Sequence, residues 1–347
     1  MSEQITVSVL GAAGFVGGEL IRLLQSHRQV KLLDATSRAR AGQAIGRSLP
    51  ALRHFPEAGR KRFSTIETMR EADVVFSCLP GGVLPRVLAQ IRPKAKRIIN
   101  LAGDYRLRDP ALLATHYPET AAHGVPEGAR YLIPEFWQQD YADCQLINLP
   151  GCMAVATFYS LYPLVAAGLV EGEIVAEAKT GSSGSGKESA EHPAERSHNY
   201  RPYKLSGHRH EPEIIQALRD HAGSEVALRL SVGSLDGPRG ISVSSFMTLR
   251  DGVTELDVRK AFFSAYGGTR FVRYLGQAQG PWNVPMLKTV VGSNAVEVAS
   301  HVDGRRCTVI SALDNLIKGA AGQGIQAMNL MHGFSEDEGL THGGMWP

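Results

Sequence analysis

Cys152 directly follows a Pro-Gly pair, between a strand predicted over 144–149 and an apolar helix predicted over 153–168. The N–H groups and the dipole at a helix N-terminus stabilise a thiolate, so a cysteine placed there is suited to nucleophilic catalysis. A free cysteine is as often a small, inert core residue. That alternative fits Cys78 and Cys307 better, because both lie within apolar runs.

Two histidines close the segment 203–210, Tyr-Lys-Leu-Ser-Gly-His-Arg-His, which precedes a predicted acidic helix. A histidine at the end of a loop and beside Arg209 can act as a general acid/base. His208 is the first candidate for this role, and His210 competes with it. The alternatives are a cluster of surface histidines or a zinc site, although no Cys or His-Glu-x-x-His pattern supports zinc. Its ligands would be His192, His198, His208 and His210.

The glycine-rich segment 11–17, Gly-Ala-Ala-Gly-Phe-Val-Gly, lies between a strand predicted over 5–10 and a helix predicted over 15–27. The first glycine permits a tight turn, the second lets the backbone approach a pyrophosphate, and the third allows close helix–strand packing. The helix N-terminus supplies N–H groups to phosphate. An ordinary glycine-rich turn is the alternative. The predicted dinucleotide site comprises Gly11, Ala13, Gly14, Phe15, Val16 and Gly17.

The strand predicted over 30–37 ends in Thr36, Ser37 and Arg38, with Arg40 close behind. NAD sites usually carry Asp or Glu at this strand end, to accept from the ribose 2′-OH. A hydroxyl and a guanidinium suit a 2′-phosphate instead, so Ser37 and Arg38 favour NADP. The alternative is that these arginines are ordinary solvated surface residues.

Strands alternate with helices over the first 150 residues, which is typical of a parallel, doubly wound Rossmann-type sheet. Beyond residue 150 the pattern indicates an α+β domain with an antiparallel or mixed sheet. Further strands are predicted over 73–78, 97–101, 174–180, 225–234 and 240–250, with two or three more within 289–315; further helices are predicted over 258–268 and 315–334.

The composition excludes several classes of protein. A chain of 347 residues predicts two domains, and 43% hydrophobic residues can fill their cores. A net charge of +3 without a basic stripe excludes a nucleic-acid binder. No apolar run suits a membrane helix, and no signal peptide is evident. Four widely spaced cysteines argue against a zinc ribbon or disulfide scaffold, so we expect a cytoplasmic protein with reduced thiols.

Nearly the whole chain resembles the N-acetyl-γ-glutamyl-phosphate reductases of arginine biosynthesis, and even more their lysine-pathway relatives that reduce a substrate carried by a small protein. The resemblance implies a semialdehyde dehydrogenase-like fold: an NADP-binding domain over 1–150, completed by the helix 315–334, and a catalytic and dimerisation domain over 151–314. The matching segments are GAAGFVGGEL (11–20), TSRARAG (36–42), LAGDYRLRD (101–109), LPGCMAVAT (149–157), RPYKLSGHRHEPEI (201–214), GPRGI (237–241), VVGSN (290–294) and DNLIKGAAGQGIQAMN (314–329).

The resemblance also implies a mechanism. Cys152 would attack an acyl phosphate to form a thioester, NADPH would reduce it to an aldehyde, and His208 would be the acid/base. Further cofactor contacts would come from Ser182, Gly184, Asn315, Lys318, Gly319 and Gln323. Substrate contacts would come from Arg106, Ser183, Tyr203, Arg209 and Arg239.

Three positions depart from the family pattern: Gly81 replaces a histidine, Asn100 replaces an aspartate, and Met153 follows the cysteine. The segment 192–197 and the ending 344–347 resemble those of the lysine-pathway branch of the family. A basic run there would suit a small acidic carrier protein, although a solvated charged loop is the alternative. The run contains Arg196, Arg201, Lys204 and Arg209.

Other interpretations of the resemblance stay open. The substrate is either a carrier-linked glutamyl or aminoadipyl phosphate or the acetyl-blocked glutamyl phosphate, and the enzyme is a homodimer or homotetramer. Aspartate-semialdehyde chemistry and a non-catalytic NADP-binding sensor are the remaining alternatives. Only an enzyme needs Cys152 together with His208, and the chain has both.

Overall fold

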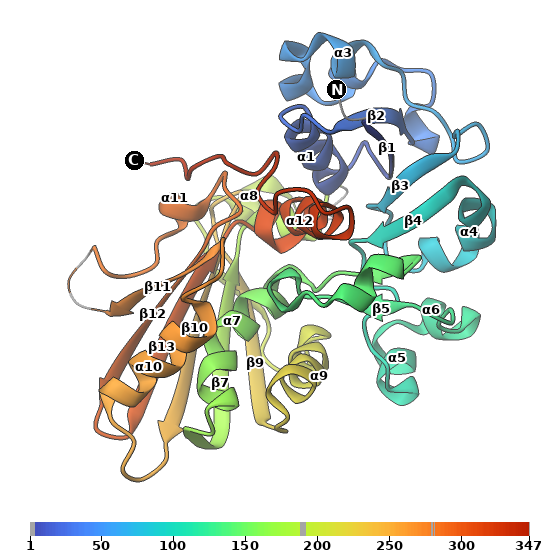
Figure 1. Ribbon diagram of the computed structural model, residues 1–347. Coiled ribbons are helices and arrows are strands. Elements are labelled where there is room, and N and C mark those ends of the chain that lie inside the picture. The colour runs from blue at the N-terminus through green and yellow to red at the C-terminus, as the bar shows by residue number, and fades with distance from the viewer. Residues whose placement is uncertain (1–3, 188–191, 279, 281, 347) are drawn as a thin grey trace. The chain divides into compact units, whose positions relative to one another are not determined.

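The computed structural model describes residues 4–187, 192–278, 280 and 282–346. The chain divides into two compact units (Figure 1). Unit 1 comprises Met1–Gly151 and Ala320–Thr341, and unit 2 comprises Cys152–Gly319 and His342–Pro347. The helix predicted over 315–334 is therefore shared between the units, because the chain up to Gly319 belongs to unit 2.

Unit 1 is built on a six-stranded sheet in the order β2-β1-β3-β4-β6-β5. Every pairing in it is parallel, which confirms the doubly wound Rossmann-type domain. The strand order reverses between β1 and β3, and ligands of such sheets bind at the carboxyl ends of the strands beside this point. The strands are β1 (Ile5–Leu10), β2 (Val30–Ala35), β3 (Ala72–Ser77), β4 (Ala95–Asn100), β5 (Arg130–Tyr131) and β6 (Leu146–Asn148).

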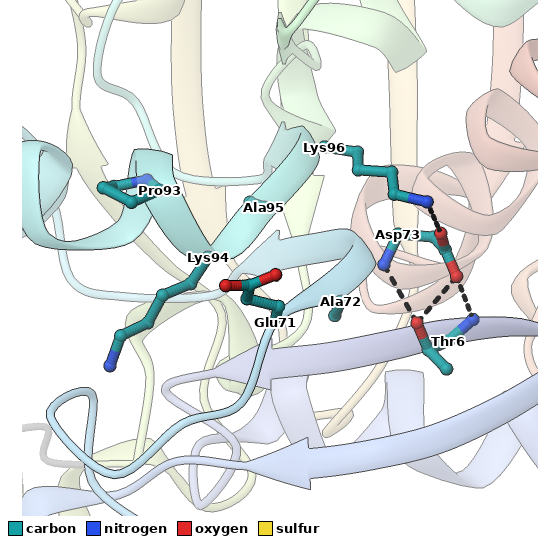
Figure 2. Close-up of a pocket in the computed structure, with 8 residues that line it drawn as sticks. All are labelled: Thr6, Glu71, Ala72, Asp73, Pro93, Lys94, Ala95 and Lys96. Carbon is teal, nitrogen blue, oxygen red and sulfur yellow. Dashed lines mark hydrogen bonds and ion pairs between the residues drawn. The ribbon is translucent and has the colours of Figure 1, made fainter.

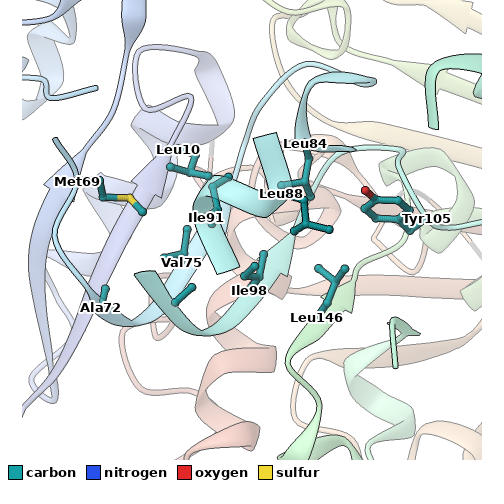
Figure 3. Packing of buried hydrophobic residues seen from close by; sticks show 11 residues of the cluster. Leu10, Met69, Ala72, Val75, Leu84, Leu88, Ile91, Ile98, Tyr105 and Leu146 are labelled. Atoms are coloured by element: carbon teal, nitrogen blue, oxygen red, sulfur yellow. The ribbon is translucent and has the colours of Figure 1, made fainter. Parts of the chain in front are cut away.

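Helix α4 (Val83–Ile91) covers part of this sheet through one apolar face. Leu84, Leu88 and Ile91 recur at helical spacing and are buried against Val75 of β3 and Ile98 of β4 (Figure 3). Burying such side chains contributes roughly 1.5–3 kcal/mol each. This packing fixes β3 and β4, which lie between β1 and β6, the strands that precede the glycine-rich loop and Cys152.

Among the remaining helices of unit 1, α1 contacts β1 and β2, and α12 contacts β4. Asp109 caps α5 by accepting hydrogen bonds from the N–H groups of Ala111 and Leu112. His27, just after α1, bonds Asn329 of α12 at 2.8 Å. These helices are α1 (Phe15–Leu24), α2 (Ile45–Ser48), α3 (Pro56–Arg60), α5 (Pro110–His116), α6 (Pro118–His123) and α12 (Gly322–Met331).

Unit 2 is built on a seven-stranded sheet in the order β11-β12-β13-β10-β7-β9-β8. The β7/β9 and β11/β12 pairs are parallel and the others antiparallel, so the predicted α+β domain has a mixed sheet. The strands are β7 (Val170–Thr180), β8 (Arg201–Lys204), β9 (Ala227–Ser234), β10 (Ile241–Leu249), β11 (Val272–Gln277), β12 (Val296–Asp303) and β13 (Arg306–Leu313).

Helix α7 (Cys152–Ala166) is almost entirely buried in unit 2. It contacts β10, β13, α9 (His210–Ala222) and α10 (Glu255–Tyr266). Ser160 bonds Ser245 of β10 at 2.7 Å, and Ser311 of β13 donates to the carbonyl of Ala156 at 2.8 Å. These buried hydrogen bonds fix the register of the helix on the sheet, so Cys152 at its first residue has a fixed position.

The structure differs from the sequence-based expectations in several elements. Strands β5, β8 and β11 were not predicted, because all three are edge strands of their sheets and β5 and β8 are also short. The last predicted helix begins with a π-helical turn over Ile317–Ala321. Unit 2 also contains two short helices, α8 (Pro193–Arg196) and α11 (Leu287–Val290). Across the described residues, no helix has the length and apolar character required to span a bilayer.

Candidate active site

The loop after β1 has the geometry of a phosphate-binding turn. Gly11 has a φ of +68°, and a Cβ there would lie 2.5 Å from the carbonyl oxygen of Cys78. A Cβ at Gly17 would lie 2.7 Å from the Cα of Ala12. A Cβ at Gly14 would meet only the Gly11 carbonyl oxygen, at 3.4 Å. The first and third glycines are therefore required by the protein itself, and Gly14 keeps the start of α1 free of a side chain.

The N-terminus of α1 is suited to an anion. Its N-cap residue is Gly14, no side chain caps it, and its first turn contains no acidic residue. Ala13 and Val16 are half-buried, and Phe15 is 41% exposed. The unsatisfied N–H groups and the dipole at such a helix start fit a pyrophosphate.

The end of β2 lies against this loop, because Ala12 N–H donates to the carbonyl of Thr36 at 2.9 Å. Ser37 is half-buried and Arg38 exposed. Asp34 is the acidic residue of β2, and it accepts from the backbone and guanidinium of Arg70. Its carboxylate is therefore engaged at Arg70, and the residues left at the strand end suit a 2′-phosphate.

Gln323, also in unit 1, is completely buried on α12. Its Nε2 donates to the carbonyl of Pro150 at 2.9 Å. Its Oε1 has no hydrogen-bond partner among the residues that the structure describes. A buried acceptor of this kind fits an amide donor such as a nicotinamide carboxamide, because an unpaired buried polar atom costs about 1–3 kcal/mol.

Two asparagines at the ends of β4 and β6 form a network that sequence reasoning missed. Asn100 Nδ2 donates to the Oδ1 of Asn148 at 3.1 Å and to the carbonyl of Asp104 at 3.1 Å. An aspartate could not donate these bonds, which explains the amide at position 100. At the other departure, Gly81, a Cβ would meet no atom within 4 Å, so packing does not require glycine there.

Arg106, predicted to contact substrate, is buried. Its Nε donates to the carbonyl of Leu149 at 2.7 Å, and its Nη2 donates to that of Leu101 at 2.8 Å. The guanidinium therefore holds the backbone just before Pro150 in place. This position indicates a structural contribution to the turn that leads to Cys152.

Cys152 is the first residue of α7 and is half-buried. All four cysteines are free thiols. Burial raises the pKa of the thiols of Cys78 and Cys307 to about 12, and it also raises the pKa of Cys144. Cys152 is the cysteine placed at a helix N-terminus, where a thiolate is stabilised.

His208 and His210 are both buried, with ring centres 4.8 Å apart. The backbone N–H of His210 donates to Nδ1 of His208 at 3.2 Å. A ring nitrogen that accepts carries no proton, so the neutral ring of His208 carries its proton on Nε2. His210 lies in the first turn of α9, with its Nε2 4.0 Å from the buried carboxylate of Glu213. The ring of His208 therefore has a defined tautomer with its proton on Nε2, whereas the ring of His210 lies near a carboxylate. This difference favours His208 as the acid/base.

Tyr203 lies close to both predicted catalytic residues. Its ring centre is 6.5 Å from that of His208. Burial raises the pKa of the Tyr203 hydroxyl, and the charge of Cys152 raises it further, whereas Arg209 lowers it. Cys152, Tyr203, His208 and Arg209 all belong to unit 2, and the charges of Cys152 and Arg209 act on the Tyr203 hydroxyl. Arg209 is exposed.

The Gly/Ser loop after β7 is held by the turn at 237–240. Ser182 N–H donates to the carbonyl of Gly237 at 2.9 Å, and Ser183 N–H donates to that of Pro238 at 3.1 Å. A Cβ at Gly181 would lie 2.7 Å from the backbone nitrogen of Arg239, so only glycine permits this approach. A Cβ at Gly184 would lie 3.3 Å from the Thr180 hydroxyl.

Two further side chains hold this loop. Asn315 accepts from Gly240 N–H at 2.8 Å and donates to the Ser183 hydroxyl at 2.9 Å. Arg196, expected on a basic rim, donates to the Ser185 hydroxyl at 2.7 Å. Both residues therefore order the loop in this structure. The contacts of Asn315 join segments far apart in the sequence, which is why the sequence alone did not indicate them.

Arg239, the other predicted substrate arginine, pairs with the completely buried Asp314 at 3.3 Å. Lys318 is completely buried too, with Nζ 5.5 Å from the ring centres of both Tyr159 and Phe271. Sequence reasoning missed Asp314, although an acidic residue three positions before a helical turn is a recognisable capping signal.

Two open cavities lie away from these residues. One, of about 320 Å³, is at the amino ends of the parallel strands, where Asp73 pairs with Lys96 and bonds Thr6 (Figure 2). The other, of about 410 Å³, is lined by Arg47, Arg53 and Arg60. None of the predicted site residues lines either cavity. Within the described ranges, no group of His, Cys, Asp or Glu side chains could hold a metal ion.

The two units match two family models. Residues 6–143 match the NAD-binding domain of semialdehyde dehydrogenases, and residues 152–315 match the dimerisation domain of the same proteins. The chain belongs to the semialdehyde dehydrogenase family, and it is an oxidoreductase.

Two similar proteins show to which branch of this family the chain belongs. The chain is 41% identical to N-acetyl-gamma-glutamyl-phosphate reductase 1 of Lactiplantibacillus plantarum, over 98% of this chain and 99% of that protein. It is 39% identical, over 96% of each chain, to a putative phosphate reductase of Caldivirga maquilingensis named for LysW-linked L-2-aminoadipate and L-glutamate. These likenesses confirm the predicted phosphate reductase branch.

Solved structures share the fold at low identity. Aspartate semialdehyde dehydrogenase II of Vibrio cholerae has a TM-score of 0.72 at 14% identity, covering 95% of this chain and 99% of that one. The Candida albicans aspartate semialdehyde dehydrogenase with NADP has a TM-score of 0.70 at 17% identity, covering 94% and 98%. Both confirm the expected semialdehyde dehydrogenase-like architecture.

Proposed function

We propose that this enzyme uses NADPH to reduce an amino-blocked γ-glutamyl or α-aminoadipyl phosphate to its semialdehyde, with release of phosphate. The observation that carries the proposal is Cys152 at the first residue of α7, in the same unit as the buried His208, whose ring centre lies 6.5 Å from that of Tyr203. Bound NADPH supplies the hydride that the reduction requires. In unit 1 the groups that fit it are the loop 11–17, Ser37, Arg38 and Gln323.

The chemistry proceeds through Cys152. Its thiolate attacks the acyl carbon, the bond from that carbon to the phosphate oxygen breaks, and phosphate leaves a thioester on Sγ. His208 Nε2–H donates a proton to the oxyanion that reduction creates. His208 then takes this proton back as the carbonyl re-forms and Sγ leaves as thiolate. Every proton step therefore uses the ring nitrogen that His210 N–H does not occupy.

A carrier-linked substrate is the form that we favour. The segment 196–210 contains no Asp or Glu, and it exposes Lys204 and Arg209 together with Leu205, which is 70% exposed. Cationic and apolar groups side by side suit an acidic carrier protein. Arg196 contributes less to this surface, because it bonds the Gly/Ser loop. The acetyl-blocked substrate is the alternative, which the 41% identical relative supports.

The enzyme forms a homo-oligomer through unit 2, which is supported by the match of residues 152–315 to a dimerisation domain. A dimer or a tetramer is consistent with this description. Phe246 on the central strand β10 is 47% exposed, which suits an interface between copies. Four free thiols suit the reducing cytoplasm, where we place the enzyme.

The reverse reaction tests the substrate. N-acetylglutamate semialdehyde and a carrier-linked semialdehyde are each assayed with phosphate and NADP. We expect Lys204→Glu to raise KM for the carrier-linked substrate about tenfold, more at low salt, because surface charges steer an acidic partner. Lys260→Glu, an exposed lysine on α10, is the matched control. Efficient turnover of the acetyl substrate alone, unchanged by Lys204→Glu, would return the enzyme to arginine biosynthesis.

A further inference from the structure

The chain enters α12 through a π-helical turn, Ile317–Ala321. Such turns are rare, and they occur frequently at functional sites. Gly319 lies in the middle of this turn. A Cβ at position 319 would lie 2.6 Å from the Cβ of Cys152 and 3.2 Å from its Cα. Carbon atoms do not approach so closely, so any other residue at 319 must displace the turn or the cysteine.

Asp314 anchors the turn from one end. Its Oδ1 accepts from the N–H groups of Leu316 at 2.8 Å and Ile317 at 3.2 Å. Its backbone oxygen accepts from Gly319 N–H at 2.9 Å. Its Oδ2 accepts from Gly292 N–H at 2.9 Å and pairs with Arg239. A completely buried carboxylate with this many donors resists any shift of the turn.

Lys318 anchors the turn along α7. Its ammonium lies 5.5 Å from the ring centre of Tyr159, about two helical turns beyond Cys152. Residues at this spacing share a face of a helix. Lys318 and Gly319 are therefore consecutive residues that contact two sites on one face of α7. A turn held at both of these sites has little room to move away from the cysteine.

We propose that Gly319 is a positioning residue that, through the π-helical turn, holds Cys152 at the N-terminal end of α7. The glycine leaves space for the Cβ of Cys152, and Asp314 and Lys318 keep that space fixed. This function is separate from the cofactor contact that the family resemblance implies for Gly319. It rests on the proposed function only in taking Cys152 as the nucleophile.

Gly319→Ala tests the proposal in the full-length enzyme. The added methyl group displaces Sγ, so we expect the iodoacetamide rate constant of Cys152 and its pH profile to change. Turnover should fall on the order of 100-fold, as a misplacement of about 1 Å does elsewhere, with an unchanged Kd for NADPH. Gly324→Ala is the control, because its Cβ would meet the Leu101 and Phe76 side chains at a milder 3.3 Å. Weaker NADPH binding with an unchanged alkylation profile would overturn the proposal.

A double-mutant cycle keeps the test independent of activity and of the substrate. Cys152→Gly removes the Cβ that the alanine at 319 would strike. We therefore expect Gly319→Ala to lower the unfolding temperature much less in the Cys152→Gly background than in the wild-type background. The same result is expected if Gly319→Ala folds only in that background. Equal losses in both backgrounds, or failure to fold in both, would contradict the contact.

Discussion

Helices α1 and α7 both begin just after a parallel strand of unit 1 in the sequence, and the structure equips their N-termini differently. α1 starts at a bare glycine, and a Cβ at Gly14 would meet only one backbone atom at 3.4 Å. α7 starts at Cys152, and a Cβ at Gly319 would lie 2.6 Å from the Cβ of this cysteine. The first N-terminus suits an anion from outside the protein, and the second stabilises an anion that the protein itself carries.

The comparison of the two helix starts shows that a glycine can be required for different reasons. Where the absent Cβ would strike protein atoms, as at Gly17 and Gly319, the fold or the nucleophile requires glycine. Where it would strike almost nothing, as at Gly14, the requirement comes from a ligand. The expected effects below range from the largest to the smallest.

Replacing the thiol at α7 should have the largest effect. We expect Cys152→Ser to lower kcat by at least about 10⁴-fold, because a serine hydroxyl is a poor nucleophile at neutral pH. NADPH binding, which the first N-terminus provides, should be unchanged. Stopped-flow reduction and fluorescence titration measure the two quantities. Loss of both together would mean that the two helix starts are not functionally separate.

The same thiol should be the first to react with iodoacetamide. Cys78 and Cys307 have pKa values raised to about 12 by burial, so they remain protonated and unreactive at pH 8. Their reactivity should increase only as the pH approaches those values. Peptide mapping after limited alkylation identifies the modified residue. Earlier modification of Cys78 in the folded protein would remove Cys152 as the nucleophile.

Replacing the acid/base residue should have the next largest effect on kcat. We expect His208→Asn to lower kcat by roughly 10²–10⁴-fold, the usual contribution of proton transfer. His210→Asn is the matched control, since His210 is a neighbouring buried imidazole that lies near Glu213. If His210→Asn lowers kcat more, the two roles must be exchanged.

At the first helix start, Arg38→Ala should raise Kd for NADPH by ~10- to 100-fold, the loss of one charge-assisted hydrogen bond. Kd for NADH should change little, because NADH has no 2′-phosphate. Arg60→Ala, at an exposed arginine elsewhere in unit 1, is the control. Equal losses for both cofactors would contradict the NADP assignment.

Substitutions at Gly14 and Gly17 should separate the effect on cofactor binding from the effect on stability. Gly17→Ala should lower the free energy of unfolding by about 1–3 kcal/mol, the usual cost of overpacking, because its Cβ would lie 2.7 Å from backbone atoms. Gly14→Ala should leave stability nearly unchanged and raise Kd for NADPH about tenfold, or 1.4 kcal/mol. Chemical denaturation and titration check both. The reverse pattern would refute the distinction drawn between these glycines.

The sequence predicts the parts of the site that depend on local signals. The loop 11–17 stands between a periodic strand and helix, and Cys152 follows a Pro-Gly turn, so both can be located without coordinates. The sheet class follows from the alternation of strands and helices.

The remaining parts depend on contacts between distant segments. Arg106 has the charge of a substrate anchor, yet its guanidinium bonds two backbone carbonyls. Arg239 is committed to Asp314, and Asn315 bonds Ser183. Nothing in the spacing of these residues reports which partner each one meets, because that depends on how the sheet of unit 2 brings its loops together.

The close approach of Gly319 to Cys152 has an evolutionary consequence. This contact couples two positions far apart in the gene, because the clash with the Cβ of Cys152 disappears when no side chain remains at 152. A descendant that retained the fold but replaced the cysteine by glycine would be released from this constraint, and position 319 would be free to drift. In such descendants, variation at position 319 would record the loss of catalysis before the fold showed any other sign of it.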